Sequence, residues 1–140
     1  MNNDKITVTK RERDCITALG KNRKETFPTR ISSLAKSLSM KMPTVEEIVQ
    51  RLMNKGLVQK KAGMVILTDS GNECYDEIIM KHRVMETFLF ECGVDPDKAC
   101  EEVSEFDYLI DSESAGKIID KIGKPEKCPH GFNIVEGKNR

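Results

Sequence analysis

The sequence predicts a mostly α-helical protein, with an N-terminal winged helix-turn-helix followed by a helical dimerisation domain. Two observations carry this prediction. Residues 31–68 have the pattern of a short helix, a tight turn, an amphipathic helix and a small hairpin with lysines at its tip. The residues after them hold three further helical patterns, of which the first is stopped by Gly93 and the last is ended by Gly123. We expect residues 1–72 to form the first domain and residues 73–140 the second.

The expected elements of the first half follow from capping and periodicity. Thr9 is a suitable N-cap for a helix that ends near Gly20, and Ser32 for a second helix. Pro43 suits the first position of the third helix, and Gly56 its left-handed end. The third helix should bury one apolar face, formed by Val45, Ile48, Val49, Leu52 and Met53.

The second half continues from the hairpin into helices. Thr68 is a suitable cap for a long helix, Pro96 for the start of another, and Asp111 for the cap of a last one. The tail from Lys127 onward has no regular period. The expected ranges are strands at 57–60 and 64–67 and helices at 69–91, 96–108 and 112–122.

Composition excludes several classes of protein. Of 140 residues, 38% are hydrophobic and 33% are charged, and there is no Trp. No apolar run approaches the roughly 20 residues that cross a bilayer, and the polar start lacks a signal-peptide core. We therefore expect a cytoplasmic protein without a membrane partner. Five cysteines, an odd number without a CxxC pair, argue against a disulfide framework.

Charge divides unevenly along the chain. Residues 1–70 carry 14 Lys and Arg against 7 Asp and Glu, or +7, whereas residues 71–140 carry 9 against 16, or −7. A basic first half can meet DNA phosphates, where neutralisation releases counterions. An acidic second half is better suited to dimer contacts or to cation binding.

The third helix and the hairpin hold the predicted DNA-binding residues. Residues near the start of a recognition helix reach base edges in the major groove, whereas lysines set its register on phosphate. Pairing two such modules through the long helix would suit a palindromic double-stranded operator. The predicted set is Lys41, Pro43, Thr44, Glu47, Gln50, Arg51, Lys60 and Lys61. The alternative is a winged helix that serves only as a protein-interaction module, which the acidic Glu46 and Glu47 favour.

Four phrases of the sequence resemble the diphtheria-toxin-repressor family of metal-dependent transcriptional regulators. They are LTDSG at 67–71, KHRVME at 81–86 with Phe88 and Leu89, GVD at 93–95 and CPHGFN at 128–133. The resemblance covers nearly all of residues 5–135 and is to the two-domain type. It implies a homodimeric repressor that senses Fe²⁺ or Mn²⁺. Filling the metal site would favour the DNA-binding state.

The resemblance also implies metal ligands. His82 and Glu86 match two ligands of the family's ancillary site and lie one helical turn apart. Cys100 stands where the family usually has histidine, and its thiolate shifts preference toward softer metals such as Zn²⁺ or Fe²⁺. We expect at most one metal in each protomer, at His82, Glu86 and Cys100.

The family's primary metal site departs further from its pattern. Arg11 occupies the position of the first-helix ligand, and Ser104 and Tyr108 replace two others. Asp107 is the one ordinary ligand that remains there, and Asp14 matches a carboxylate of the manganese-sensing branch. This site is expected to be lost or rebuilt, with Asp107 as a remaining ligand.

Alternatives remain open for control and for the tail. The cysteines allow a metal-independent, thiol-based signal on the same DNA-binding dimer. Cys128 and His130 lie in a predicted tight turn that could also ligate metal. An enzyme is not expected, because no nucleophile–base pair and no phosphate-binding glycine loop has a recognisable spacing.

Overall fold

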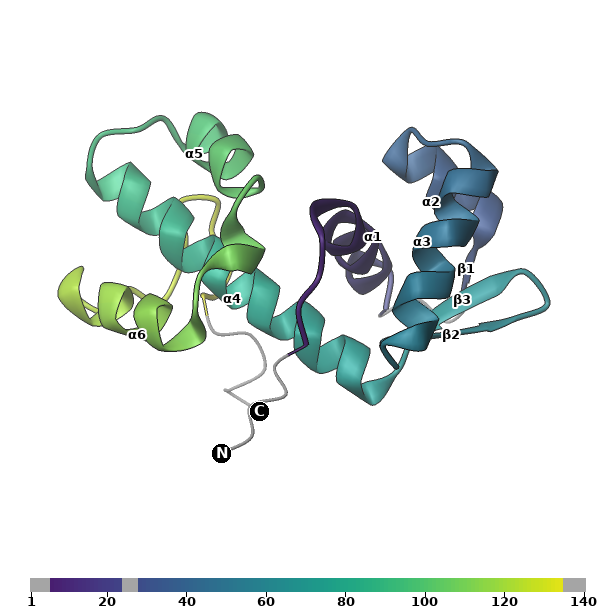
Figure 1. The fold of residues 1–140 in the computed structure, drawn as a ribbon. Helices are drawn as coiled ribbons and strands as arrows, with labels where there is room; N and C mark the ends of the chain where they lie inside the picture. The colour runs from purple at the N-terminus through teal and green to yellow at the C-terminus, as the bar shows by residue number, and fades with distance from the viewer. Residues whose placement is uncertain (1–5, 24–27, 135–140) are drawn as a thin grey trace. The chain divides into compact units, whose positions relative to one another are not determined.

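A computed structural model describes residues 6–23 and 28–134 and confirms the mostly α-helical fold class (Figure 1). The chain forms two compact units, residues 1–75 and 76–140, with the border inside the longest helix. No helix among the described residues has the length and apolarity to span a bilayer. The elements are α1 (Lys10–Lys21), β1 (Thr29–Arg30), α2 (Ile31–Leu38), α3 (Met42–Asn54), β2 (Val58–Lys61), β3 (Met64–Leu67), α4 (Asp69–Glu91), α5 (Pro96–Val103), the 3₁₀ turn η1 (Asp107–Leu109) and α6 (Ser112–Lys121).

The helix-turn-helix of the first unit has the predicted core but a different start. Four of the five residues predicted on the inner face of α3 are buried, and Met53 is half-buried. Ser32 does not cap α2, because the helix begins at Ile31 directly from β1. The Ile31 amide donates to the Gly63 carbonyl at 3.0 Å, so the hairpin satisfies one of the donors at the N-terminus of α2.

The wing is a three-stranded antiparallel sheet in the order β1-β3-β2. Its hairpin turns through Ala62 and Gly63, which have φ angles of 52° and 77°. Two residues with positive φ match the right-handed twist of the strands they join. The sequence analysis predicted β2 and β3 but missed β1, since a two-residue strand has no alternating pattern to detect.

The helices of the second unit follow the prediction except at α5. Thr68 caps α4 by accepting from the Gly71 amide at 3.0 Å, and Asp111 caps α6. The helix expected to reach Tyr108 ends instead at Val103, and η1 follows after a break. The Ser104 hydroxyl donates to the Cys100 carbonyl at 2.9 Å, and such competition with the backbone ladder is typical where a helix ends.

The C-terminal segment of the described chain is more ordered than its sequence indicated. Lys127 and Asn133 form an isolated antiparallel bridge, and the Cys128 amide donates to the Phe132 carbonyl at 2.9 Å. Cys128 and Ile134 are buried in the core of the second unit, together with Val84 and Ala115. The tight turn predicted at Cys128–Gly131 is therefore packed into the core of this unit.

Gly20 permits close packing within the first unit. It lies next to the last residue of α1, and an added Cβ would stand 2.0 Å from Tyr75 Cδ1. Tyr75 is 6% exposed and its ring also faces the Arg23 guanidinium, 4.6 Å from the ring centroid. The helix ends near Gly20 as predicted, and this glycine also makes room for an aromatic ring.

Glu12 holds α1 to α3 from a fully buried position. Its carboxylate accepts from Lys55 Nζ at 2.6 Å, from Arg51 Nε at 3.1 Å and from the Thr9 amide at 3.0 Å. Burial alone would raise the pKa of Glu12, but these three hydrogen bonds outweigh it and hold the pKa below its ordinary value. The charged form of Glu12 therefore stabilises the folded first unit.

Replacing Gly20 with Ala should destabilise the protein by about 1–3 kcal/mol, because the new methyl group collides with the Tyr75 ring. Gly116→Ala in α6 is the matched control, since nothing lies within 4 Å of its added Cβ. That variant should be neutral or more stable by up to about 1 kcal/mol. Urea unfolding measures both values, and equal effects of the two substitutions would contradict the packing role of Gly20.

The stability that Glu12 contributes should depend on pH. Its pKa is lower in the folded state than in the unfolded chain, so the contribution is complete above the unfolded value of about 4.3. It is lost as pH falls through the lower folded value. We expect the difference in free energy of unfolding between wild type and Glu12→Gln to shrink as the pH is lowered from 6 to about 3. A constant difference over that range would show that the charge is not involved.

Candidate metal centre and nucleic-acid interface

Three potential metal ligands meet within the second unit. α4 presents His82 and Glu86 one turn apart, and α5 presents Cys100. One ligand atom from each lies within 4.8 Å of the others, and His82 Nε2 is 3.4 Å from Cys100 Sγ. Glu86 is 2% exposed and His82 is 9% exposed. The three residues that the sequence analysis grouped are thus adjacent in space.

Asp107 contacts this cluster through the histidine. Its Oδ2 lies 2.9 Å from His82 Nδ1, and the residue has no exposed surface. An ionised carboxylate can only accept, so this contact favours the His82 tautomer that donates from Nδ1 and leaves Nε2 toward Cys100. Asp107, expected from the sequence among the metal ligands, lies in direct contact with His82, one of the three potential ligands. Such carboxylate–histidine pairs are the usual second layer of metal sites.

His130 is a neighbour of the cluster that the sequence analysis left in a turn. Its Nδ1 lies 2.5 Å from Glu86 Oε2 and its Nε2 lies 2.9 Å from Asp97 Oδ1. The hydrogen bonds to Asp97 and then to Glu86 raise the pKa of His130. The buried Glu86 carboxylate is thereby partnered by the His130 imidazole. Only the CPHG phrase hinted at this contact, which joins residues 44 positions apart.

The donor set fits a borderline-soft divalent metal. An imidazole nitrogen at about 2.1 Å and a thiolate at about 2.3 Å from a tetrahedral ion stand about 3.6 Å apart. The observed separation of 3.4 Å between His82 Nε2 and Cys100 Sγ is close to this value. Within the described ranges, this is the one group of three His, Cys, Asp or Glu residues with metal-site spacing.

The other positions of the expected primary site do not gather into a ligand set among the described residues. Arg11 is exposed on α1, and Asp14 forms ion pairs with Lys10 at 2.8 Å and Arg13 at 3.0 Å. The Ser104 hydroxyl is committed to the backbone of α5. Asp107 alone among these positions touches a potential ligand.

The cysteines differ in their capacity for thiol chemistry. Cys15 is fully buried, and burial, together with the charges of Glu12 and Asp14, raises its pKa to about 12. A thiol with this pKa is not ionised at neutral pH and is unreactive. Cys128 is buried as well, whereas Cys92 is exposed.

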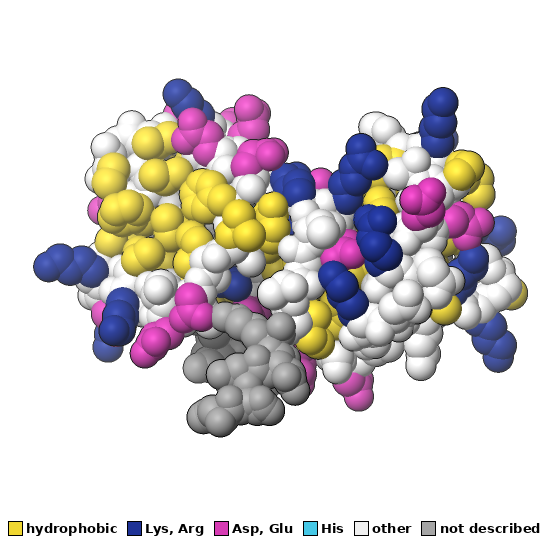
Figure 2. All heavy atoms as spheres, viewed as in Figure 1, with side chains coloured by type: hydrophobic (Ala, Val, Ile, Leu, Met, Phe, Trp, Pro, Cys, Tyr) yellow, Lys and Arg dark blue, Asp and Glu magenta, His cyan; other side chains and the backbone are white. Residues whose placement is uncertain are grey.

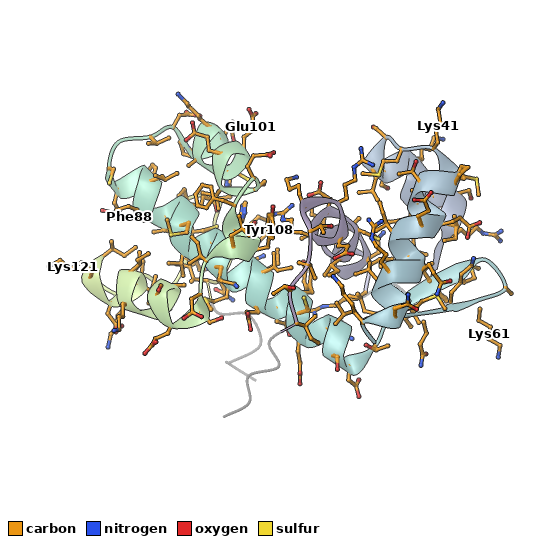
Figure 3. The ribbon with its side chains drawn as sticks, viewed as in Figure 1. Lys41, Lys61, Phe88, Glu101, Tyr108 and Lys121 are labelled. Carbon is orange, nitrogen blue, oxygen red and sulfur yellow. The ribbon has the colours of Figure 1, made fainter. Side chains whose placement is uncertain are left out.

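The predicted DNA-facing residues lie on α3 and the wing. Thr44 is half-buried, and all the others of the set are exposed. Figure 3 shows Lys41 extending from the start of α3 and Lys61 from the wing. A groove of about 340 Å³ lies between the starts of α2 and α3 and the wing, and Arg30, Glu46 and Lys60 contribute its charged groups.

Side-chain pairs order the outer face of α3. On the wing side, Lys60 Nζ is 2.5 Å from Glu46 Oε1. Along the face, Gln50 Nε2 donates to Asn54 Oδ1 at 3.1 Å, and on the α1 side Arg51 is bound by Glu12. Thr44 and Glu47 lie on the same face as these pairs. The pairing of Lys60 with Glu46 was not anticipated, because residues 14 positions apart meet only when the wing folds against α3.

Comparison with known proteins places both units in one family. Residues 68–136 match the iron dependent repressor, metal binding and dimerisation domain. The chain is 29% identical over 101 residues to the HTH-type transcriptional regulator MntR of Lysinibacillus sphaericus (strain C3-41), covering 71% of this chain and 73% of that protein.

Solved structures extend the match over the first unit. A hypothetical protein from Sulfolobus solfataricus is 35% identical with a TM-score of 0.79, covering 91% of this chain and 98% of that one. A manganese-dependent transcriptional repressor in complex with manganese is 26% identical with a TM-score of 0.78. The match to it covers 91% of this chain but 59% of the repressor. The chain therefore belongs to the diphtheria-toxin-repressor family, whose members are metal-dependent transcriptional regulators and not enzymes.

Proposed function

We propose that this protein is a homodimeric repressor that binds a palindromic double-stranded operator and is controlled by a divalent transition metal, Fe²⁺ or Mn²⁺. The observation that carries the proposal is the assembled cluster of His82, Glu86 and Cys100 in a chain of this family. In this scheme residues 1–72 supply the DNA-binding surface, and residues 73–140 supply the dimer contacts and the metal site.

His82, Glu86 and Cys100 would hold the metal, and Asp107 would keep the Nε2 lone pair of His82 aimed at it. A bound cation would link α4 to α5 with bonds stronger than the hydrogen bonds now joining them. The thiolate of Cys100 favours Fe²⁺ over Mn²⁺ and also admits Zn²⁺. Control of DNA binding requires that the DNA-competent state bind the metal more tightly than the other state does.

Homodimer formation is supported by an apolar surface on the second unit. Figure 2 shows hydrophobic side chains gathered between α5 and α6, and Figure 3 labels Phe88 and Tyr108 there. Leu109 is 70% exposed and Phe90 is 44% exposed. A contiguous apolar patch on a charged protein marks an interaction surface, and a second copy of the chain is the partner that the family predicts.

Control of operator binding by metal is tested by measuring DNA affinity while metal is titrated into the protein. Salt-dependent binding to DNA from upstream of the protein's own gene should strengthen on addition of Fe²⁺, Mn²⁺ or Zn²⁺ relative to chelator. His82→Ala should abolish this gain, and Asp107→Ala should weaken metal binding by roughly 10- to 100-fold without removing a ligand.

Cys100→Ser should weaken Fe²⁺ and Zn²⁺ binding more than Mn²⁺ binding, because it replaces a soft ligand with a hard one. Cys92→Ser is the matched control, since Cys92 is exposed and lies outside the cluster. Equal DNA affinity in chelator and in metal would rule out metal control. Absence of any salt-dependent DNA binding would instead favour a protein-interaction module.

Disrupting the apolar surface should separate the subunits. We expect Leu109→Lys to raise the dimer dissociation constant by 10-fold or more, because a charge replaces an exposed apolar contact. Ile66→Lys is the control, since Ile66 is 52% exposed on β3 of the first unit. Sedimentation velocity over a range of concentrations measures both variants. An unchanged dimer in Leu109→Lys would place the interface elsewhere.

A further inference from the structure

We propose that the buried Glu12 of α1 orders Arg51 of α3 for end-on contact with DNA and is therefore a positioning residue for DNA recognition. This inference rests on the proposed DNA-binding function and adds to it a residue that does not itself face DNA. It follows from the hydrogen bond between Glu12 and Nε of Arg51, which leaves the two terminal nitrogens of Arg51 available.

Glu12 is held so firmly that it can act as a fixed support. It has no exposed surface, and both carboxylate oxygens are engaged: Oε1 by Lys55 and the Thr9 amide, and Oε2 by Arg51. Glu12 also completes a reciprocal capping box with Thr9, whose hydroxyl accepts from the Glu12 amide at 3.2 Å. A buried carboxylate that loses its cationic partners is strongly destabilising, so these bonds should persist when DNA binds.

Arg51 uses only one of its five N–H groups in the hydrogen bond to Glu12. Its Nε donates to Glu12 Oε2, and the side chain remains 47% exposed. Within residues 6–23 and 28–134, no hydrogen bond or ion pair engages its two terminal nitrogens. With Nε anchored, the plane of the guanidinium is set and its terminal edge is left for an outside acceptor.

The other basic residues near Arg51 are placed differently. Lys55 donates to both Glu12 and the Thr7 carbonyl, at 2.6 and 2.8 Å, which ties it to the start of α1. Lys60 is paired with the exposed Glu46, so its anchor lies at the surface. Arg51 thus combines a fully buried anchor with a free bidentate edge.

The chemistry of that edge defines its target. Two parallel N–H donors match two adjacent acceptors, such as guanine O6 and N7 or two phosphate oxygens. A guanidinium already fixed in one plane loses less conformational entropy on binding than a free one. Glu12 would therefore contribute to affinity for the correct geometry rather than to general attraction for DNA.

The test uses a duplex recovered with the full-length wild-type protein from a random-sequence pool, and an unselected duplex of the same length. Arg51→Ala should lower affinity for the selected duplex by roughly 10- to 100-fold. Glu12→Gln should lower it by at least about 3-fold in the wild-type background and by less than about 2-fold in the Arg51→Ala background. Glu73→Gln removes one exposed carboxylate from the same unit and should have no such effect.

Two arms identify the acceptor. If Arg51 meets a base, Arg51→Lys should relax the selected sequence at one position with the salt dependence unchanged. If it meets phosphate, Arg51→Lys should retain the salt slope while Arg51→Ala weakens binding to both duplexes and reduces that slope by about 1. Either result supports the proposal that Glu12 orders Arg51, provided that Glu12→Gln lowers DNA affinity only when Arg51 is present.

The inference is overturned if Glu12→Gln binds both duplexes more tightly with a steeper salt slope, since Glu12 would then withhold Arg51 from DNA. It is also overturned if Glu12→Gln and Arg51→Ala act additively. Urea unfolding identifies any folding defect of Glu12→Gln, and the milder Glu12→Asp is then used in its place. Failure of the wild-type protein to enrich any sequence or to bind either duplex would instead count against the proposed DNA-binding function.

Discussion

A carboxylate that is removed from water must be met by a cation or by hydrogen-bond donors, and this constraint shapes both units of the protein. Glu12, Glu86 and Asp107 are all at most 2% exposed. Each is met by basic side chains: Glu12 by Arg51 and Lys55, and the other two by histidines. Because an unpaired buried charge is so costly, these partners hold their elements in a defined arrangement. Glu12 lies against α3, Glu86 is one of the three potential metal ligands, and Asp107 contacts another of them.

In the second unit this constraint surrounds the three potential metal ligands with residues that orient them. Asp107 contacts Nδ1 of His82 and Nε2 faces Cys100, while Glu86 is joined to the C-terminal turn through His130. The buried Lys81, next to His82 in sequence, donates to the Ile110 carbonyl at 2.6 Å and so holds the chain just after η1. Orientation of the ligands therefore depends on residues drawn from α4, α5, η1 and the C-terminal turn together.

In the first unit the polar face of α3 is less free than its sequence indicates. Of the side chains predicted to meet DNA, Lys60, Gln50 and Arg51 already have partners within the unit. Such pairs reduce the conformational entropy that binding must remove, at the expense of adaptability. Of these three partners only Glu12, which binds Arg51, is buried. The contact of Arg51 is therefore fixed, whereas those of Lys60 and Gln50 can rearrange. The acidic Glu46 and Glu47 weaken the electrostatic argument for DNA binding. Of these two, Glu46 forms an ion pair with Lys60 and so holds the wing to α3.

The sequence by itself determined the fold class, the helix-turn-helix and the grouping of His82, Glu86 and Cys100, because capping, periodicity and family phrases are local signals. Ser32 was misread as a cap because the start of α2 depends on the wing, which lies far along the chain. The packing of Gly20 against Tyr75 has no local signal either. Only the tertiary structure decided that Asp107 contacts His82, that His130 reaches Glu86 and that Glu12 holds Arg51. These contacts join residues 25 to 44 positions apart, and which of many polar side chains pair over that distance is decided by packing.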